Sequence, residues 1–184
     1  LEEVWKAIYE RGFVNQFVEM TPLHPESDAH GRPVRKLVGR AVTGQYCPSR
    51  PDYLAASTEL GEAQGYSGLL PNQWIIDNLE KRDVIVIDMF DKIFKGTFVG
   101  GNLSTAIKTR TETGGAVIWG GMRDVEQVMG IPDIQIYHRG VDPTGLREIC
   151  MVGYNTPVTI GSGLSAATCL PGDIVFGTTS GVLF

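Results

Sequence analysis

The chain has 184 residues, of which 42% are hydrophobic and 20% charged, and its formal net charge is −5. This length and composition suit a single globular domain over 1–184 that can bury a sizeable core. The negative charge offers no general attraction to nucleic acid or anionic lipid. No apolar run approaches the roughly 20 residues of a membrane-spanning helix. We therefore expect neither a nucleic-acid nor a membrane partner.

The three cysteines are odd in number and widely spaced, at Cys47, Cys150 and Cys169. This pattern excludes a complete disulfide framework and a CxxC metal knuckle. It indicates a reducing compartment, and we expect a cytoplasmic protein. Because the sequence begins at Leu1 and not at Met, we expect further residues to precede it, with a removed signal peptide as the alternative.

The first part of the chain, up to residue 73, is predicted to combine helix, loop and strand. Apolar side chains at near-helical spacing indicate a helix near the start, followed by a loop rich in Pro, His and acids. In chain order we expect a helix within 1–14, a loop over 21–35, a strand over 37–46 and an irregular segment over 48–73 with one helix near 53–64. We interpret 1–36 as an N-terminal helix and loop, and 48–73 as an insertion.

The second part alternates between strands and helices. The expected elements are a helix over 74–82, a buried strand over 83–90, a glycine turn and helix over 98–114, a buried strand over 115–121, a short helix over 122–130 and a strand over 133–140. Strand–helix–strand alternation at this spacing predicts an α/β fold with parallel neighbouring strands. The last third is β-rich, with turns at Pro171-Gly172 and Ser180-Gly181.

Two other motifs have simple structural interpretations. The segment GSGLSA (161–166) matches GxGxxA, but a turn at Pro171 comes too soon for a crossover helix, and no acid follows at the spacing that ribose binding needs. We predict a glycine-rich turn.

A Pro-rich loop carries four possible metal ligands at alternating positions, His24, Glu26, Asp28 and His30. Their spacing matches no standard metal site, so we predict a solvated loop. Cys47 and Cys150 have no histidine nearby in sequence and are not predicted nucleophiles.

The segment Gly100-Gly101-Asn102-Leu103 opens a predicted helix after a buried strand. Two glycines allow a ligand to approach the backbone closely, and the first N–H groups of the helix would point at an anion. In the alternative interpretation, the glycines only turn the chain and Asn102 caps the helix.

Arg123 and Asp124 follow the next buried strand and also allow two interpretations. Asp124 with Gln127 forms an aspartate version of the capping box, which would open the short helix. Alternatively, the guanidinium binds a carboxylate or enolate, while the carboxylate and waters hold Mg²⁺. Both segments follow parallel strands of one unit, so they meet at the same sheet edge. This arrangement favours a single pocket with two anion-binding elements and a metal carboxylate.

The sequence resembles the RraA-like family, which includes the 4-hydroxy-4-methyl-2-oxoglutarate aldolases. The resemblance covers roughly 37–184. It rests on VIVID, on GGNLSTAIKTR followed by GAVIWGGMRDV, on YHRGVDPTG, and on the order of NTPVTIGSG and PGDIVFG. It implies a swivelling β/β/α three-layer sandwich that assembles as trimers or hexamers, with active sites between subunits.

The resemblance also implies roles for particular residues. Asp124 would bind the divalent ion, Mg²⁺ or Mn²⁺, and Arg123 would contact the pyruvate oxygen. Gly101, Asn102 and Leu103 would receive the substrate carboxylate through backbone amides. Arg139 corresponds to a basic residue that binds substrate in the family. The members that regulate ribonuclease E lack the aspartate, so Asp124 favours an enzyme.

Three features depart from the aldolase pattern. The acid three residues after the aspartate is Gln127 here, with Glu126 one position early; the acidic pair before the final strand is Thr178-Thr179; and 48–73 is longer. We predict a metal-dependent lyase that releases pyruvate from a 4-hydroxy-2-oxo acid or decarboxylates oxaloacetate. The alternatives are a hydro-lyase acting on a sugar acid and a non-catalytic protein-binding regulator. The sequence contains no cofactor loop for the methyl transfer assigned to some relatives.

Overall fold

The computed structural model describes residues 1–66 and 71–184. The helices are α1 (Glu2–Tyr9), α2 (Pro51–Ala63), α3 (Pro71–Asp77), α4 (Gly101–Thr111), α5 (Val125–Met129) and the 3₁₀ turn η1 (Gly163–Ser165). The strands are β1 (Phe17–Val18), β2 (Thr21–Pro22), β3 (Leu37–Pro48), β4 (Asp83–Val99), β5 (Gly115–Met122), β6 (Gln135–His138), β7 (Gly140–Val141), β8 (Ile149–Tyr154), β9 (Val158–Ile160), β10 (Ala167–Cys169), β11 (Ile174–Thr178) and β12 (Gly181–Leu183).

The centre of the molecule is a sheet whose middle strands are parallel. Within the described residues, its strand order is β1-β12-β11-β3-β4-β5-β6-β2, with β7 on β5 and β8 on β3. The pairs β3–β4, β4–β5 and β5–β6 are parallel, as the strand–helix–strand pattern predicts. Strands β9 and β10 form a separate antiparallel pair.

Two hydrophobic cores cover the two faces of this sheet. Side chains of β4 alternate between them, because successive residues of a strand point to opposite faces. Ile85 and Ile87 pack with Ile107 of α4 on the helix side. Val84 and Val86 pack on the other face, in the cluster that includes side chains of β9 and β10. The β-branched run is therefore buried on both sides.

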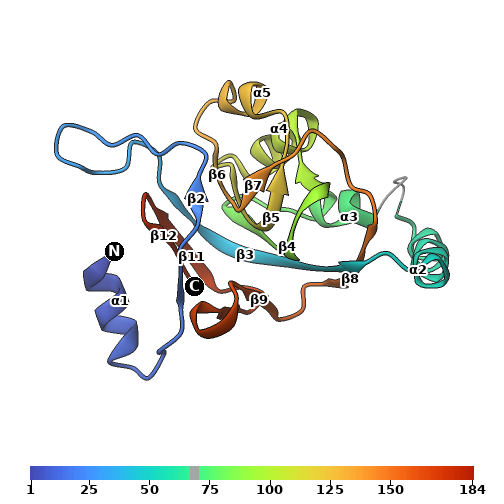
Figure 1. Ribbon diagram of the computed structural model, residues 1–184, viewed down its shortest axis with the longest axis horizontal. Coiled ribbons are helices and arrows are strands. Elements are labelled where there is room, and N and C mark those ends of the chain that lie inside the picture. Colours follow the sequence, from blue (N-terminus) through green and yellow to red (C-terminus); the bar gives the residue numbers. More distant parts are fainter. Residues whose placement is uncertain (67–70) are drawn as a thin grey trace.

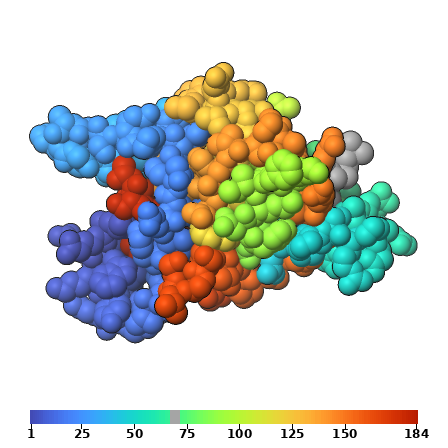
Figure 2. Space-filling view, viewed as in Figure 1, coloured from blue at the N-terminus to red at the C-terminus, as the bar shows by residue number. Residues whose placement is uncertain are grey.

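The result is a mixed α/β fold with helices on one face of a large sheet. Figure 1 shows α3, α4 and α5 gathered on one side of the sheet and β9 on the other. The fold class predicted from the sequence is confirmed. Helix α1 stands beside β11 and β12, and α2 projects at the opposite end of the molecule; both extremities are visible in Figure 2. No helix in the described residues is long and apolar enough to cross a membrane.

Several element boundaries differ from the sequence prediction. The helix expected over 74–82 is α3, which ends at Asp77. Beyond it, Asp83 Oδ2 accepts the N–H of Glu80 at 2.8 Å, and this bond stabilises a turn in place of another helical turn. Within the predicted insertion, α2 forms the expected helix, while 67–70 lie outside the described residues.

Strand β4 is much longer than the predicted 83–90. Its second half is irregular: Phe90, Asp91 and Lys95 have positive φ, and the register with β5 shifts after Asp88. Such bulges interrupt the two-residue alternation of buried and exposed side chains, so the sequence pattern does not predict this part of the strand. The register shifts again between Thr97 and Val99, where β4 ends, and Gly100 then links the strand to α4.

The glycine-rich segment over 161–166 is a turn, as predicted. It contains η1 and joins β9 to β10, which pair antiparallel with Ala167 opposite Ile160. A dinucleotide fingerprint requires a parallel strand–helix–strand unit at this position. The antiparallel hairpin therefore confirms that the motif match has no nucleotide-binding meaning.

Candidate functional site

The topology brings the N-terminus of α4 and the segment after β5 together. Strands β4 and β5 are parallel neighbours, and Val99 at the end of β4 lies opposite Met122 at the end of β5. The N–H of Arg123 then donates to the carbonyl oxygen of Val99 at 2.9 Å. Gly101 begins α4 two residues after Val99, so Arg123 and Asp124 lie directly beside that helix terminus.

Asp124 is bonded to the start of α4 and does not cap its own helix with its side chain. Its Oδ2 accepts the N–H of Gly101 at 3.1 Å. Asp124 adopts the left-handed conformation (φ 57°, ψ 40°), which aspartate tolerates better than most residues, and its side chain makes no cap bond to α5. The capping-box interpretation is therefore wrong, because the left-handed backbone directs the carboxylate toward the neighbouring helix.

Two glycines make this approach possible. A Cβ at Gly100 would lie 2.2 Å from Asp124 Oδ2 and 2.8 Å from Arg123 Nε. A Cβ at Gly101 would lie 2.0 Å from Cδ of Gln127. These distances are too short for real contacts, so any larger residue displaces the site's side chains. The glycines thus allow side chains of the next segment to approach the backbone closely; the approach of a ligand stays a prediction.

Arg123 is held by β4. Its Nη1 donates to the carbonyl oxygen and the Oγ1 of Thr97, each at 3.3 Å, and its Nε lies 3.7 Å from Asp124 Oδ2. Thr97 is fully buried, and its hydroxyl in turn donates to the carbonyl oxygen of Thr144. The guanidinium is therefore positioned by a buried residue that the sequence does not single out, because Thr97 lies in the irregular half of β4.

The first turn of α4 keeps free backbone donors. Gly100 is the N-cap and has no side-chain cap bond, so Asn102 lies within the helix and does not cap it. The capping interpretation of Asn102 is wrong. In an α-helix the first N–H groups have no intrahelical acceptor. The amides of Asn102 and Leu103 remain available for an anion beside Arg123, and the N–H of Gly101 is already bonded to Asp124.

The carboxylate of Asp124 also keeps one oxygen available. Its side chain is 45% exposed, and no described residue donates a hydrogen bond to Oδ1. No group of three or more His, Cys, Asp and Glu side chains forms a metal site within the described residues. A Mg²⁺ ion needs only one or two carboxylates, because it keeps several waters. The residues present therefore fit a hydrated Mg²⁺ ion or the similar Mn²⁺ ion and not a fully protein-ligated one.

Gln127 and Glu126 behave differently from the acid that they replace. The amide of Gln127 lies over Gly101, where it closes one side of the helix terminus. Glu126 is exposed on α5. The sequence does not predict the contact of Gln127 with Gly101, because it depends on the side-chain rotamer by which Gln127 of α5 reaches α4.

The structure does not bring Arg139 to this group. Its Nε pairs with Asp91 Oδ1 at 3.0 Å, and its guanidinium carbon lies 4.5 Å from the ring centroid of Trp119. Trp119 belongs to the core on the face of the sheet opposite α4. Arg139 lines a polar depression of about 830 Å³ there, with Ser162 and Ser180 among the other lining residues. Within one chain, the predicted substrate residue Arg139 therefore lies apart from Arg123.

The Pro-rich loop with His24 forms no second site of this kind within the described residues. His24 is buried, which corrects the prediction of a solvated loop; its Nε2 lies 2.8 Å from Nη1 of Arg35. Burial and the Arg35 charge lower the pKa of His24.

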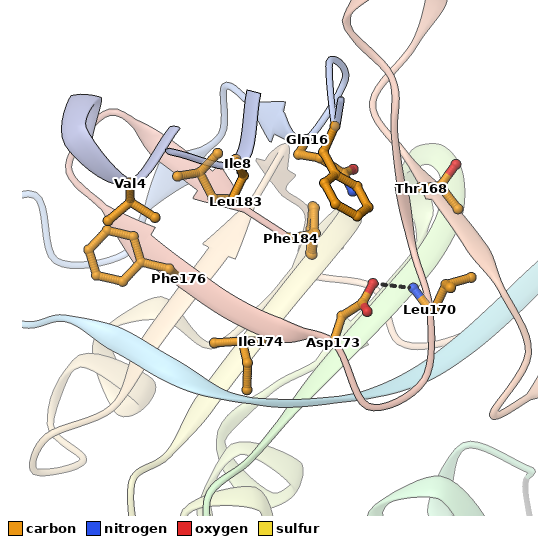
Figure 3. A pocket seen from close by; sticks show the side chains of 11 residues that line it. Val4, Ile8, Gln16, Thr168, Leu170, Asp173, Ile174, Phe176, Leu183 and Phe184 are labelled. Carbon is orange, nitrogen blue, oxygen red and sulfur yellow. Dashed lines mark hydrogen bonds between the residues drawn. The ribbon is translucent and has the colours of Figure 1, made fainter. Parts of the chain in front are cut away.

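A pocket of about 470 Å³ lies between α1 and the last strands, and Figure 3 shows its lining residues. Its walls are mainly apolar, and its carboxylate, Asp173, accepts the N–H of Leu170 at 2.8 Å.

These features define a class: a mixed α/β sandwich in which an arginine, a carboxylate and a helix N-terminus meet where two parallel strands end. The chain belongs to the RraA-like family, since the family model described as Aldolase/RraA matches residues 14–184. This family contains aldolases as well as RraA proteins.

Relatives of known structure share the fold. The chain is similar to RraAS2 from Streptomyces coelicolor, described as an unusual member of the RNase ES inhibitor RraA family, with 23% identity and a TM-score of 0.72 over 98% of this chain and 77% of that one. It is similar to the RNA-processing inhibitor RraA from Thermus thermophilis, with 14% identity and a TM-score of 0.63 over 97% of this chain and 90% of that one. At these identities the likeness concerns the fold alone.

A curated relative is much longer than this chain. Protein DlpA from Legionella pneumophila is 30% identical over 149 residues, which are 80% of this chain and 21% of DlpA. The chain thus spans about a fifth of the length of DlpA.

Proposed function

We propose that the protein is a divalent-metal-dependent lyase that acts on a 2-oxo acid. The observation that carries the proposal is the meeting of Arg123, the Asp124 carboxylate and the free α4 amides at one sheet edge. Both aldol cleavage of a 4-hydroxy-2-oxo acid and decarboxylation of oxaloacetate leave negative charge on a pyruvate enolate. A site of this kind supplies positive groups where that charge develops.

Each residue has a distinct task in this proposal. Asp124 would hold the ion, and its Oδ2 accepts the N–H of Gly101. A bound Mg²⁺ or Mn²⁺ supplies Lewis-acid polarisation of the 2-oxo group. The amides of Asn102 and Leu103 bind the substrate carboxylate, as helix N-termini bind anions elsewhere. Arg123 donates to the oxygen that becomes negative, in an orientation fixed by Thr97.

We also propose that a neighbouring copy of the chain covers this site. Asp124 is 45% exposed and Arg123 is 24% exposed, so one side of the group faces solvent. A catalytic site of this type works best when water is excluded. A homotrimer or hexamer would close it. Light scattering at assay concentration tests this: a stable monomer with full activity contradicts it.

The function is tested by pyruvate release from a panel of 4-hydroxy-2-oxo acids and oxaloacetate. We expect release that depends on added Mg²⁺ or Mn²⁺ and stops with a chelator. The same panel extended to sugar acids detects a hydro-lyase. No reaction with any substrate, with or without metal, contradicts the lyase and favours a non-catalytic regulator.

A further inference from the structure

A small pocket, partly open to solvent, lies between β3, α2, α3 and the start of β8, and we call it the Tyr46–Asn72 pocket. Its volume is about 150 Å³. Tyr46, Asn72 and Arg147 provide polar walls, while Leu54 and Leu146 are among the apolar ones. None of the residues that form the proposed lyase site lines it.

Two buried polar atoms in this pocket have no partner. Tyr46 and Asn72 are each only 5% exposed. The hydroxyl of Tyr46 and the Oδ1 of Asn72 make no hydrogen bond within the described residues. A buried polar group without a partner is unfavourable by about 1–3 kcal/mol. Both residues line the pocket, so a molecule bound there is placed to supply the missing partners.

The electrostatic surroundings favour an anion. Arg147 makes no ion pair with a described residue, whereas Glu148 beside it lies 3.5 Å from Nζ of Lys92 and 3.6 Å from Nζ of Lys95. Of the two charged residues that line the pocket, Glu148 is thus neutralised by two lysines outside the lining, and Arg147 keeps its charge unpaired within the described residues. Burial also raises the pKa of Tyr46, so its hydroxyl remains a donor at neutral pH.

The volume limits the size of the ligand. A cavity of about 150 Å³ in another protein holds benzene, which has six heavy atoms. A three-carbon 2-hydroxy acid also has six. Such an acid offers a carboxylate, which Tyr46 and Arg147 can donate to, and a hydroxyl, which can donate to Asn72 Oδ1.

We propose that the Tyr46–Asn72 pocket is a binding site for a short 2-hydroxy monocarboxylate, separate from the lyase site. The inference does not rest on the proposed lyase activity, because it uses none of that site's residues. It assigns Arg147 to charge recognition and the two buried groups to hydrogen-bond recognition.

Calorimetric titration of the metal-free 184-residue chain with lactate tests the proposal. We expect saturable binding, with lactamide and propionate each weaker by about tenfold or more, because one lacks the charge and the other the hydroxyl. Arg147→Gln and Tyr46→Phe each weaken lactate binding by about tenfold. The matched controls Arg11→Gln and Tyr53→Phe, both at exposed positions, leave it unchanged.

A second measurement excludes misfolding as the cause. Tyr46→Phe removes only an unpartnered hydroxyl, so the melting temperature without ligand stays equal or rises. The increase in melting temperature that lactate causes in the wild type disappears in this variant. Absence of saturable lactate binding overturns the proposal and leaves only water in the pocket. Binding that survives Arg147→Gln and Tyr46→Phe but is lost in Arg123→Ala also overturns it, because lactate then binds at the lyase site.

Discussion

The carboxylate of Asp124 accepts the backbone N–H of Gly101 at 3.1 Å, so the residue that follows β5 is bonded to the helix that follows β4. This one bond joins two loops of neighbouring parallel strands. It also leaves the second carboxylate oxygen directed away from the amide.

Asp124→Asn separates the structural role of this side chain from its chemical one. The amide oxygen of asparagine still accepts from Gly101, so we expect a melting temperature close to that of the wild type. The ligand charge is lost, so metal affinity and pyruvate release fall, turnover by about 10²-fold or more. Glu126→Gln, an exposed change two residues away, is the control. Full metal-dependent turnover in Asp124→Asn would show that the carboxylate has no role beyond its bond to Gly101.

Gly100→Ala tests the close approach of the two loops. The added Cβ would lie 2.2 Å from Asp124 Oδ2, so the carboxylate must move away from the helix terminus. We expect turnover to drop by about 10²-fold, the usual result of misplacing a reacting group by about 1 Å. Gly145→Ala is the matched control, since nothing lies within 4 Å of its added Cβ. Equal activity of the two variants would contradict the tight geometry.

Much of this site follows from the sequence in physical terms. Parallel strands end at the same edge, so the positions of Gly101 and Asp124 in two such units predict that they meet. The bond between them is not predictable, because it depends on the left-handed backbone of Asp124, which no local pattern requires. Thr97 is missed for a similar reason: it lies in the irregular half of β4, where the bulges hide the alternation.

The location of Arg139 and the Tyr46–Asn72 pocket show a second limit. Side chains of a strand alternate between faces, and a shift of one residue decides which core they join. Arg139 follows β6 and stacks on Trp119, on the face opposite α4, which the family resemblance did not indicate. The pocket combines Tyr46, Asn72 and Arg147 from three distant segments, so no spacing within the sequence predicts it.

The two arginines should therefore respond differently to mutation. Arg123→Ala removes a group beside Asp124, and we expect turnover to fall by about 10²–10³. Arg139→Ala removes an exposed ion pair with Asp91 and the contact with Trp119, and we expect a loss of about 1 kcal/mol or less in unfolding free energy. Its turnover should stay within a few-fold of the wild type unless subunits share residues. Measured kcat values that fall equally in both variants would place Arg139 in the site through a neighbouring subunit.

His138 predicts how stability depends on pH. Its side chain is 8% exposed, its Nδ1 has no partner within the described residues, and burial lowers its pKa. The unfolded chain therefore binds a proton more readily than the folded one below about pH 6.5, the ordinary histidine value. Above that pH His138 is neutral in both states, and the free energy of unfolding is not reduced by its protonation. As the pH falls from there through the lowered pKa of the folded state, the free energy of unfolding decreases by at most about 1.4 kcal/mol per pH unit. Denaturant unfolding across this range should show the loss, and His138→Gln should flatten it. His30→Gln, at an exposed position, is the control; an unchanged pH profile in His138→Gln would mean that other groups cause the acid sensitivity.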